Sequence, residues 1–151
     1  MFKHILLPVD GSRTSLAAVS RAADLAKALG AKVTALYVID PYPFTGVGAE
    51  NPEGRVAYLS AANSEADYAM KTAQATLKAA GVDANCEVTE SNTSWRGVLD
   101  AAKTVGADLI VMGSHGRRGL EKLVIGSVAQ RVVAHADVSV LVVRDPGVKD
   151  D

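Results

Sequence analysis

Residues 109–128 read LIVMGSHGRRGLEKLVIGSV and contain the three features that decide the fold: an apolar run, a glycine-rich turn and the start of a helix. The first four residues are apolar without alternation, which is typical of a strand covered on both faces. Gly113 and Gly116 follow this run. Gly126 and Ser127 then precede Val128 and further apolar residues at helical spacing. The stretch therefore predicts a strand, a loop and a helix.

The same alternation extends along the rest of the chain. Apolar runs at residues 5–9, 33–39 and 138–143 predict three more buried strands, and a weaker, more alternating run at 84–89 predicts a strand nearer an edge. Apolar residues at helical spacing predict helices from Ser12 to Gly30, over about residues 56–80, and from Ser94 to Gly106. Because strands and helices alternate, the pattern predicts an α/β fold with a parallel sheet and helices on both faces.

Length and composition narrow the class of protein. The chain has 151 residues, 48% hydrophobic and 22% charged, with a formal net charge of −1. This is enough for one domain with a full core, and we expect it at residues 1–144, followed by a flexible C-terminal tail at 145–151. The balanced charge is unlike that of a nucleic-acid-binding protein, and no apolar segment is long enough for a membrane span. The single cysteine, Cys86, is typical of a reducing compartment, so we expect a cytoplasmic protein.

Glycine and polar residues follow two of the predicted strands. The first strand leads into Asp10-Gly11-Ser12 and the fourth into Gly113-Ser114-His115-Gly116. In the strand order 3-2-1-4-5 these strands are neighbours, and ligands of open α/β sheets bind beyond the carboxyl ends of such strands. Glycines leave backbone N–H groups accessible, and the helix that opens at Ser127 adds free N–H groups and a favourable dipole. With Arg117 and Arg118 nearby, these features predict a crevice for a polyphosphate.

The spacing of Gly113, Gly116, Gly126 and Ser127 is Gly-x-x-Gly-x9-Gly-Ser, which resembles the motif of the ATP-binding branch of the universal stress protein family. The resemblance covers nearly the whole chain and includes residues 5–12, 36–39 and 139–143. It implies a single domain with an open five-stranded parallel sheet of order 3-2-1-4-5, in the adenine-nucleotide alpha-hydrolase-like, Rossmann-like class. It also implies a homodimer and ATP bound in the crevice between the loops after strands one and four.

The resemblance also assigns roles to individual residues. Asp10 is expected to contact adenosine above a floor shaped by Pro8 and Val9, and the backbone of Val38 is expected to meet the adenine. The residues expected around the ribose and phosphates are Met112, Gly113, Gly116, Gly126, Ser127 and Val128, and His115 and Arg117 line the same loop. A Mg²⁺ or Mn²⁺ ion that accompanies ATP is expected to be held mainly by the phosphates, with the Ser127 hydroxyl in reach.

The sequence lacks features that efficient phosphoryl transfer needs. It has no G-x-x-x-x-G-K-[ST] loop, and Met112 and Gly113 end the fourth strand where an acidic residue would be needed. We therefore expect no catalytic residue, and an ATP-binding sensor or switch of the stress response with slow or no hydrolysis. Two alternatives remain open, a weak ATPase and a homodimeric interaction module that needs no nucleotide. A phospho-acceptor receiver domain is excluded, because the third strand ends in Thr89-Glu90-Ser91 rather than in an acceptor aspartate.

Features outside the crevice bear on partners and packing. The last apolar run, from Val138 to Val143, would pair with another chain if it were left open at a sheet edge. We therefore expect a two-fold homodimer through this run, whereas the sequence identifies no other protein partner. Trp95, at the start of the third helix, is expected to be a packing anchor, and Cys86 is expected to lie in the core.

Overall fold

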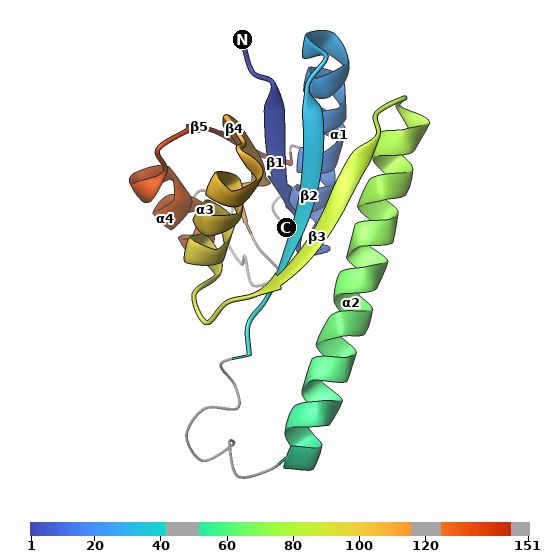
Figure 1. Ribbon diagram of the computed structural model, residues 1–151, viewed down its shortest axis with the longest axis vertical. Helices are drawn as coiled ribbons and strands as arrows, with labels where there is room; N and C mark the ends of the chain where they lie inside the picture. Colours follow the sequence, from blue (N-terminus) through green and yellow to red (C-terminus); the bar gives the residue numbers. More distant parts are fainter. Residues whose placement is uncertain (42–51, 116–124, 146–151) are drawn as a thin grey trace, which may run out of the picture.

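A computed structural model describes residues 1–41, 52–115 and 125–145. It is an α/β fold with a five-stranded parallel sheet in the order β3-β2-β1-β4-β5 (Figure 1). The strands are β1 (His4–Pro8), β2 (Lys32–Ile39), β3 (Ala84–Glu90), β4 (Leu109–Gly113) and β5 (Ser139–Val143). The helices are α1 (Arg13–Leu29), α2 (Pro52–Ala79), α3 (Ser94–Val105) and α4 (Ser127–His135). The predicted fold class and strand order are confirmed.

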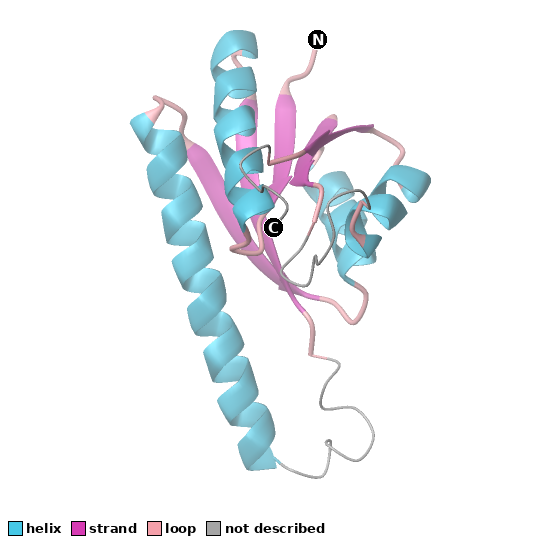
Figure 2. Ribbon diagram, turned by 180° about the vertical axis from the view of Figure 1, so that it is seen from behind, coloured by secondary structure: helices cyan, strands magenta, loops and turns pink. Residues whose placement is uncertain are grey.

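Helices cover both faces of the sheet, with α1 and α2 on one face and α3 and α4 on the other (Figure 2). Successive strand residues point to opposite faces. Ile5 and Leu7 of β1 accordingly belong to the α1–α2 core, whereas Leu6 belongs to the α3–α4 core, and all three are fully buried. The sheet therefore separates two hydrophobic clusters, which explains why the inner strands β1, β2 and β4 are apolar without alternation. The prediction that the run at 138–143 is equally buried is wrong, because β5 lies at the edge of the sheet and is partly exposed.

The ends of the helices follow the capping residues in the sequence. The Ser12 hydroxyl caps α1 by accepting a hydrogen bond from the Ser15 N–H at 3.2 Å. Gly30 closes the same helix with a φ of 66°, in the left-handed region that glycine adopts without strain. One boundary differs from the prediction, since α2 begins at Pro52 rather than near Val56. Proline is well suited to the first turn of a helix. The first turns of α2 extend beyond the sheet (Figure 1), and Val56 in them is exposed.

Trp95 and Cys86 differ in burial. Trp95 is partly buried and packs against the α3–α4 core, as expected of a packing anchor. The expectation for Cys86 is wrong, because its side chain is exposed. The reason is that β3 is an edge strand, which pairs only with β2 and which α2 covers on one face. Of the predicted tail, residues 146–151 lie outside the described residues, and Asp145 forms an ion pair with Arg13 at 3.2 Å.

The Asp108 carboxylate joins the amino-terminal ends of β1 and β4. Asp108, just before β4, accepts hydrogen bonds from the backbone N–H groups of Lys3 and His4 at 2.9–3.1 Å. These N–H groups favour the charged carboxylate, so they lower the pKa of Asp108 below its ordinary value of 3.8. The contact fixes β1 beside β4 at the end opposite the predicted crevice. Within the described ranges, no helix is both long enough and apolar enough to cross a membrane.

Candidate functional site

The loop after β1 is held in a tight turn by its own side chains. The Asp10 carboxylate accepts a hydrogen bond from the Ser12 N–H at 2.9 Å, and the Asp10 N–H donates to the Ser15 hydroxyl at 3.1 Å. Gly11 lies between them with a φ of 82°, which L side chains rarely adopt. One oxygen of Asp10 is thus used to shape the turn, and the other has no hydrogen-bond partner among the described residues.

The loops after β1 and β4 are in direct contact. The Thr14 hydroxyl donates a hydrogen bond to the carbonyl of His115, and the Ser12 hydroxyl lies 3.4 Å from the same oxygen. A Cβ at Gly113 would lie 2.7 Å from the Thr14 carbonyl carbon and 2.9 Å from the Ser15 nitrogen. A glycine is therefore required for the close approach of α1 to the end of β4, a role that the sequence did not reveal.

The same loop fixes the start of α4. The Ser114 N–H donates to the Val143 carbonyl at 2.8 Å, and the Gly126 N–H donates to the Ser114 carbonyl at 2.6 Å. Gly126 is the N-cap of α4 and has no side chain that could cap it. The first turn of α4 therefore begins beside the β4 loop with its N–H groups not capped by a side chain, and the positive end of the helix dipole lies there.

His115 presents an orphaned polar atom in the same place. Its Nδ1 lies 3.0 Å from the hydroxyl of Ser114, a side chain that is only 1% exposed. Its Nε2 is buried and has no hydrogen-bond partner among the described residues. Burial of an unpaired polar atom is costly and rare in native structures. Within the described residues, the hydrogen-bonding capacity of this atom is therefore unmet.

Several predicted binding residues lie on the α3–α4 face of the sheet. Met112 and Val38 both pack in the α3–α4 core, at the carboxyl ends of β4 and β2. Pro8 ends β1 two residues after Leu6 and so lies on the same face. The neighbouring β2, β1 and β4 thus bring three predicted residues to one edge and one face of the sheet.

Other predicted residues are placed differently. Val9 is 5% exposed and packs in the α1–α2 core, so its side chain lies on the face of the sheet opposite to Val38 and Met112. Ser127 and Val128 form the first turn of α4, where Ser127 is exposed. Gly116 and Arg117 lie outside the described residues, as do Arg118 and Lys122.

Thr14 and Ser15 are site residues that the sequence does not predict. Both are buried polar residues at the start of α1, with exposed fractions of 8% and 3%. Their hydroxyls bond to the carbonyl of His115 and to the N–H of Asp10. The signal in the sequence was the presence of polar residues at the start of an otherwise apolar helix face. This signal does not identify the hydrogen-bond partner of Thr14, which lies 101 residues away in the chain.

Comparison with known proteins gives consistent matches over the whole chain. The model of the universal stress protein family matches residues 1–144. A universal stress protein of Methanocaldococcus jannaschii is 38% identical over 146 residues, which are 97% of this chain and 84% of that protein.

Solved structures of universal stress proteins are similar to this chain in fold. The structure of universal stress protein UspA from Lactobacillus plantarum has a TM-score of 0.84 at 29% identity and covers 94% of this chain and 97% of its own. A universal stress protein solved in complex with cAMP has a TM-score of 0.69 at 25% identity and covers 95% and 97% of the two chains.

Proposed function

We propose that this chain, which belongs to the universal stress protein family, binds an adenine nucleotide, ATP in particular, in the crevice between the β1 and β4 loops. The bound nucleotide makes the protein a cytoplasmic sensor or switch of the stress response, with slow or no hydrolysis. The cAMP complex of a similar protein supports an adenine nucleotide as the class of ligand.

The observation that carries the proposal is the start of α4. Its N–H groups have no side-chain cap and lie beside the β4 loop, which holds them through the Gly126–Ser114 hydrogen bond of 2.6 Å. Such a helix start binds phosphate through its N–H groups and its dipole. The unpartnered Nε2 of His115 lies on the same loop. The two features suit a phosphorylated ligand.

Different residues of the crevice bind the base, the ribose and the phosphates of the nucleotide. Pro8, Val38 and Met112, on one face of the sheet, offer apolar contacts to the base and ribose, and the unused oxygen of Asp10 accepts a hydrogen bond from a ribose hydroxyl. The first turn of α4 and the Ser127 hydroxyl bind phosphate oxygens. A Mg²⁺ or Mn²⁺ ion that accompanies ATP would be coordinated by the phosphates and by Ser127, and it would neutralise part of their charge.

The test is calorimetric titration of ATP into the wild type and two variants. Ser127→Pro removes one N–H and the hydroxyl, and proline suits this first helical position because Gly126 has φ −59° and ψ 155°, as a residue before proline requires. We expect Ser127→Pro to weaken ATP binding by about tenfold to a hundredfold, since a hydrogen bond to a charged group contributes about 1.5–3 kcal/mol. Ser127→Ala keeps the N–H and should weaken binding less.

The control for this titration is the thermal stability of the two variants without nucleotide. Both variants should melt close to the wild type when no ATP is present, because both residues are compatible with the first turn of a helix. Equal ATP affinity in the wild type and Ser127→Pro would show that the phosphates do not lie on α4. Phosphate release at several turnovers per second would contradict slow hydrolysis.

A second candidate function, a homodimeric interaction module that needs no nucleotide, is favoured by β5. This strand pairs with β4 alone, and Leu141 on it is 39% exposed. An open apolar edge strand is a template for pairing with a second copy. Light scattering at micromolar concentration should give twice the chain mass, with and without ATP. A dimer that shows no ATP binding by calorimetry would favour this second function.

A further inference from the structure

The carboxyl end of β2 extends beyond the end of β1. The pairing of the two strands ends at Pro8 and Leu36. The last hydrogen bond that joins them in the described part of the chain runs from the Val9 N–H to the Leu36 carbonyl, at 2.8 Å. The pairing of β2 with β3 continues to Ile39. Residues 38–40 therefore form an overhang of β2, which has a neighbouring strand on the β3 side only.

The β2 overhang leaves the backbone groups of Val38 unpaired on the β1 side. Successive residues of a strand direct their N–H and C=O groups alternately to the two neighbouring strands. Leu36 bonds to the β1 side, and the Ile39 carbonyl accepts a hydrogen bond from the Ser91 N–H on the β3 side at 2.9 Å. The N–H and C=O of Val38 therefore point to the β1 side, beyond the end of β1, where they have no hydrogen bond to any described residue. They are one donor and one acceptor at the edge of the proposed crevice.

A donor and an acceptor that lie side by side can distinguish one purine base from another. Adenine presents the N6 amino donor beside the N1 acceptor, whereas guanine presents the O6 acceptor beside the N1–H donor. Proteins read unpaired bases by hydrogen bonds to this edge. Since the two bases place donor and acceptor in opposite order, the backbone of Val38 selects one of them only if the β2 overhang is fixed in position.

Contacts from two helices hold the β2 overhang. On the α3 side, the backbone of Gly97 lies so close to the overhang that a Cβ at Gly97 would be 3.1 Å from the Val38 Cγ1. On the α2 side, the Tyr58 hydroxyl donates a hydrogen bond of 2.8 Å to the Asp40 carbonyl. The Tyr58 contact is made by a side-chain hydroxyl, so a substitution can remove it without altering the backbone.

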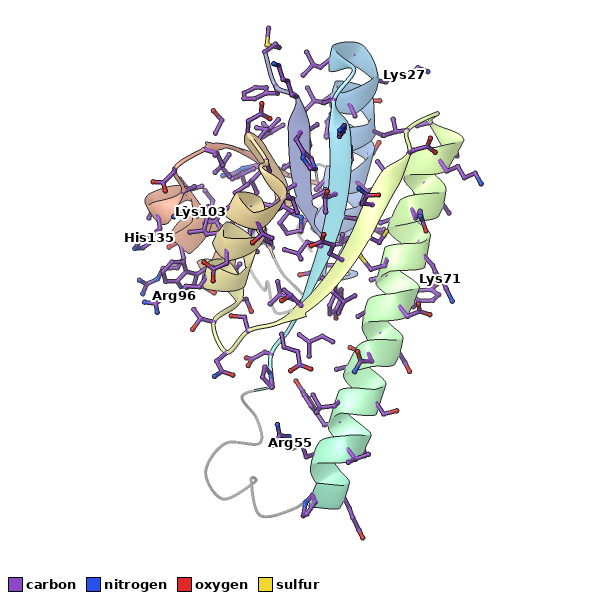
Figure 3. The ribbon with its side chains drawn as sticks, viewed as in Figure 1. Lys27, Arg55, Lys71, Arg96, Lys103 and His135 are labelled. Carbon is purple, nitrogen blue, oxygen red and sulfur yellow. The ribbon has the colours of Figure 1, made fainter. Side chains whose placement is uncertain are left out.

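The length of α2 brings Tyr58 to the β2 overhang. Figure 3 shows Lys71 of α2 beside β3 and Arg55 of the same helix beyond the end of the sheet. Tyr58 follows Arg55 by three residues, which is close to one helical turn, and it bonds to Asp40 at the end of β2. The hydroxyl therefore joins the part of α2 that extends past the sheet to the end of β2.

We propose that Tyr58 is a positioning residue that sets the base selectivity of the nucleotide site. Its hydroxyl fixes the β2 overhang, so that the N–H and C=O of Val38 lie where adenine matches them and guanine does not. This role rests on the proposed function, since it concerns the base of the nucleotide in the crevice. Because α2 and α4 lie on opposite faces of the sheet, loss of the hydroxyl should leave phosphate binding at α4 unchanged.

The test is calorimetric titration of ATP and GTP into the wild type and Tyr58→Phe. We expect the wild type to bind ATP more tightly than GTP. Tyr58→Phe should bind ATP about threefold to tenfold more weakly, which is the loss expected for one hydrogen bond between uncharged groups, and it should bind GTP as the wild type does. The ratio of the two affinities is the readout, because a general loss of structure would lower both alike.

Tyr68→Phe is the matched control. Tyr68 lies on the same helix, its side chain is 76% exposed, and its hydroxyl has no hydrogen bond to any described residue. This variant should keep the wild-type ratio of ATP to GTP affinity. Without nucleotide, both variants should melt within about 4 °C of the wild type, the largest shift expected from one lost hydrogen bond.

Three outcomes would overturn the role of Tyr58 and leave the proposed function in place. They are an unchanged ratio of affinities in Tyr58→Phe, the same fall in the ratio in Tyr68→Phe, and equal binding of ATP and GTP by the wild type. A wild type that binds neither nucleotide would refute the proposed function itself, and the role of Tyr58 with it.

Discussion

The contact between β4 and α1 makes Gly113→Ala the most informative substitution. A Cβ there would lie 2.7 Å from the Thr14 carbonyl carbon and its hydroxyl oxygen, and 2.9 Å from the Ser15 nitrogen. Two of these three atoms are backbone atoms, so relief requires a shift of the start of α1, which Ser12 and Asp10 hold by hydrogen bonds. Overpacking costs about 1–3 kcal/mol, and alanine regains about 0.5–1 kcal/mol of backbone entropy.

We therefore expect Gly113→Ala to lower the free energy of unfolding by about 1–2 kcal/mol. For a domain of this size, calorimetry should show a fall in Tm of about 2–8 °C. ATP affinity should fall as well, because the shift separates Thr14 from the carbonyl of His115. The matched control is Gly97→Ala, whose Cβ would lie 3.0 Å from the Ser91 Cβ and 3.1 Å from the Val38 Cγ1. These are side-chain atoms that can move, and alanine gains about 1 kcal/mol in a helix, so its stability should stay within about 1 kcal/mol of the wild type.

A second experiment identifies which atoms cause the strain in Gly113→Ala. Thr14→Ala removes the hydroxyl that a Cβ would meet but leaves the two backbone atoms in place. The double variant Gly113→Ala/Thr14→Ala should therefore stay as unstable as the two single variants together. If Thr14→Ala restored the stability of Gly113→Ala, or if Gly113→Ala melted as the wild type does, the reasoning from backbone contact would be refuted.

Three further predictions test other parts of the molecule. Because the N–H groups of Lys3 and His4 lower the pKa of Asp108, the stability from this contact is present above the ordinary aspartate pKa and is lost as the pH falls through the lowered value. Urea unfolding of Asp108→Asn should give lower stability at neutral pH and a smaller further loss in acid; an unchanged pH profile would contradict this. Ser12→Ala removes the cap of α1 and should cost about 1 kcal/mol, which equal urea midpoints would disprove. Leu141→Lys puts a charge on the open edge of β5 and should give monomers by light scattering, whereas a persistent dimer would place the interface elsewhere.

The fold could be predicted because its signals are local. The apolar runs of β1, β2 and β4 lie in strands that are buried on both faces. Ser12 and Gly30 fix the ends of α1 through contacts within a few residues. The exposure of Cys86 could not be predicted in the same way. It depends on which strand lies at the edge and on how far α2 covers it, and both are properties of the assembled sheet.

The candidate site could be predicted only in outline. The glycine spacing correctly placed the β4 loop beside the start of α4, as the Gly126–Ser114 hydrogen bond shows. The roles of single residues were less visible, since Gly113 is needed for its contact with Thr14 rather than for a left-handed φ. A contact between residues about a hundred positions apart leaves no trace in local spacing.

The helices on the two faces of the sheet differ in length. The 17 residues of α1 and the 28 of α2 give helices of roughly 26 and 42 Å, whereas the 12 of α3 and the 9 of α4 give roughly 18 and 14 Å. The longer pair closes its face with a larger core cluster. The shorter pair leaves a groove beside Leu99 on one flank and the uncapped start of α4 on the other. A variant that lengthened α4 would therefore be expected to reduce ligand binding before it reduced stability, since the α1–α2 core would remain intact.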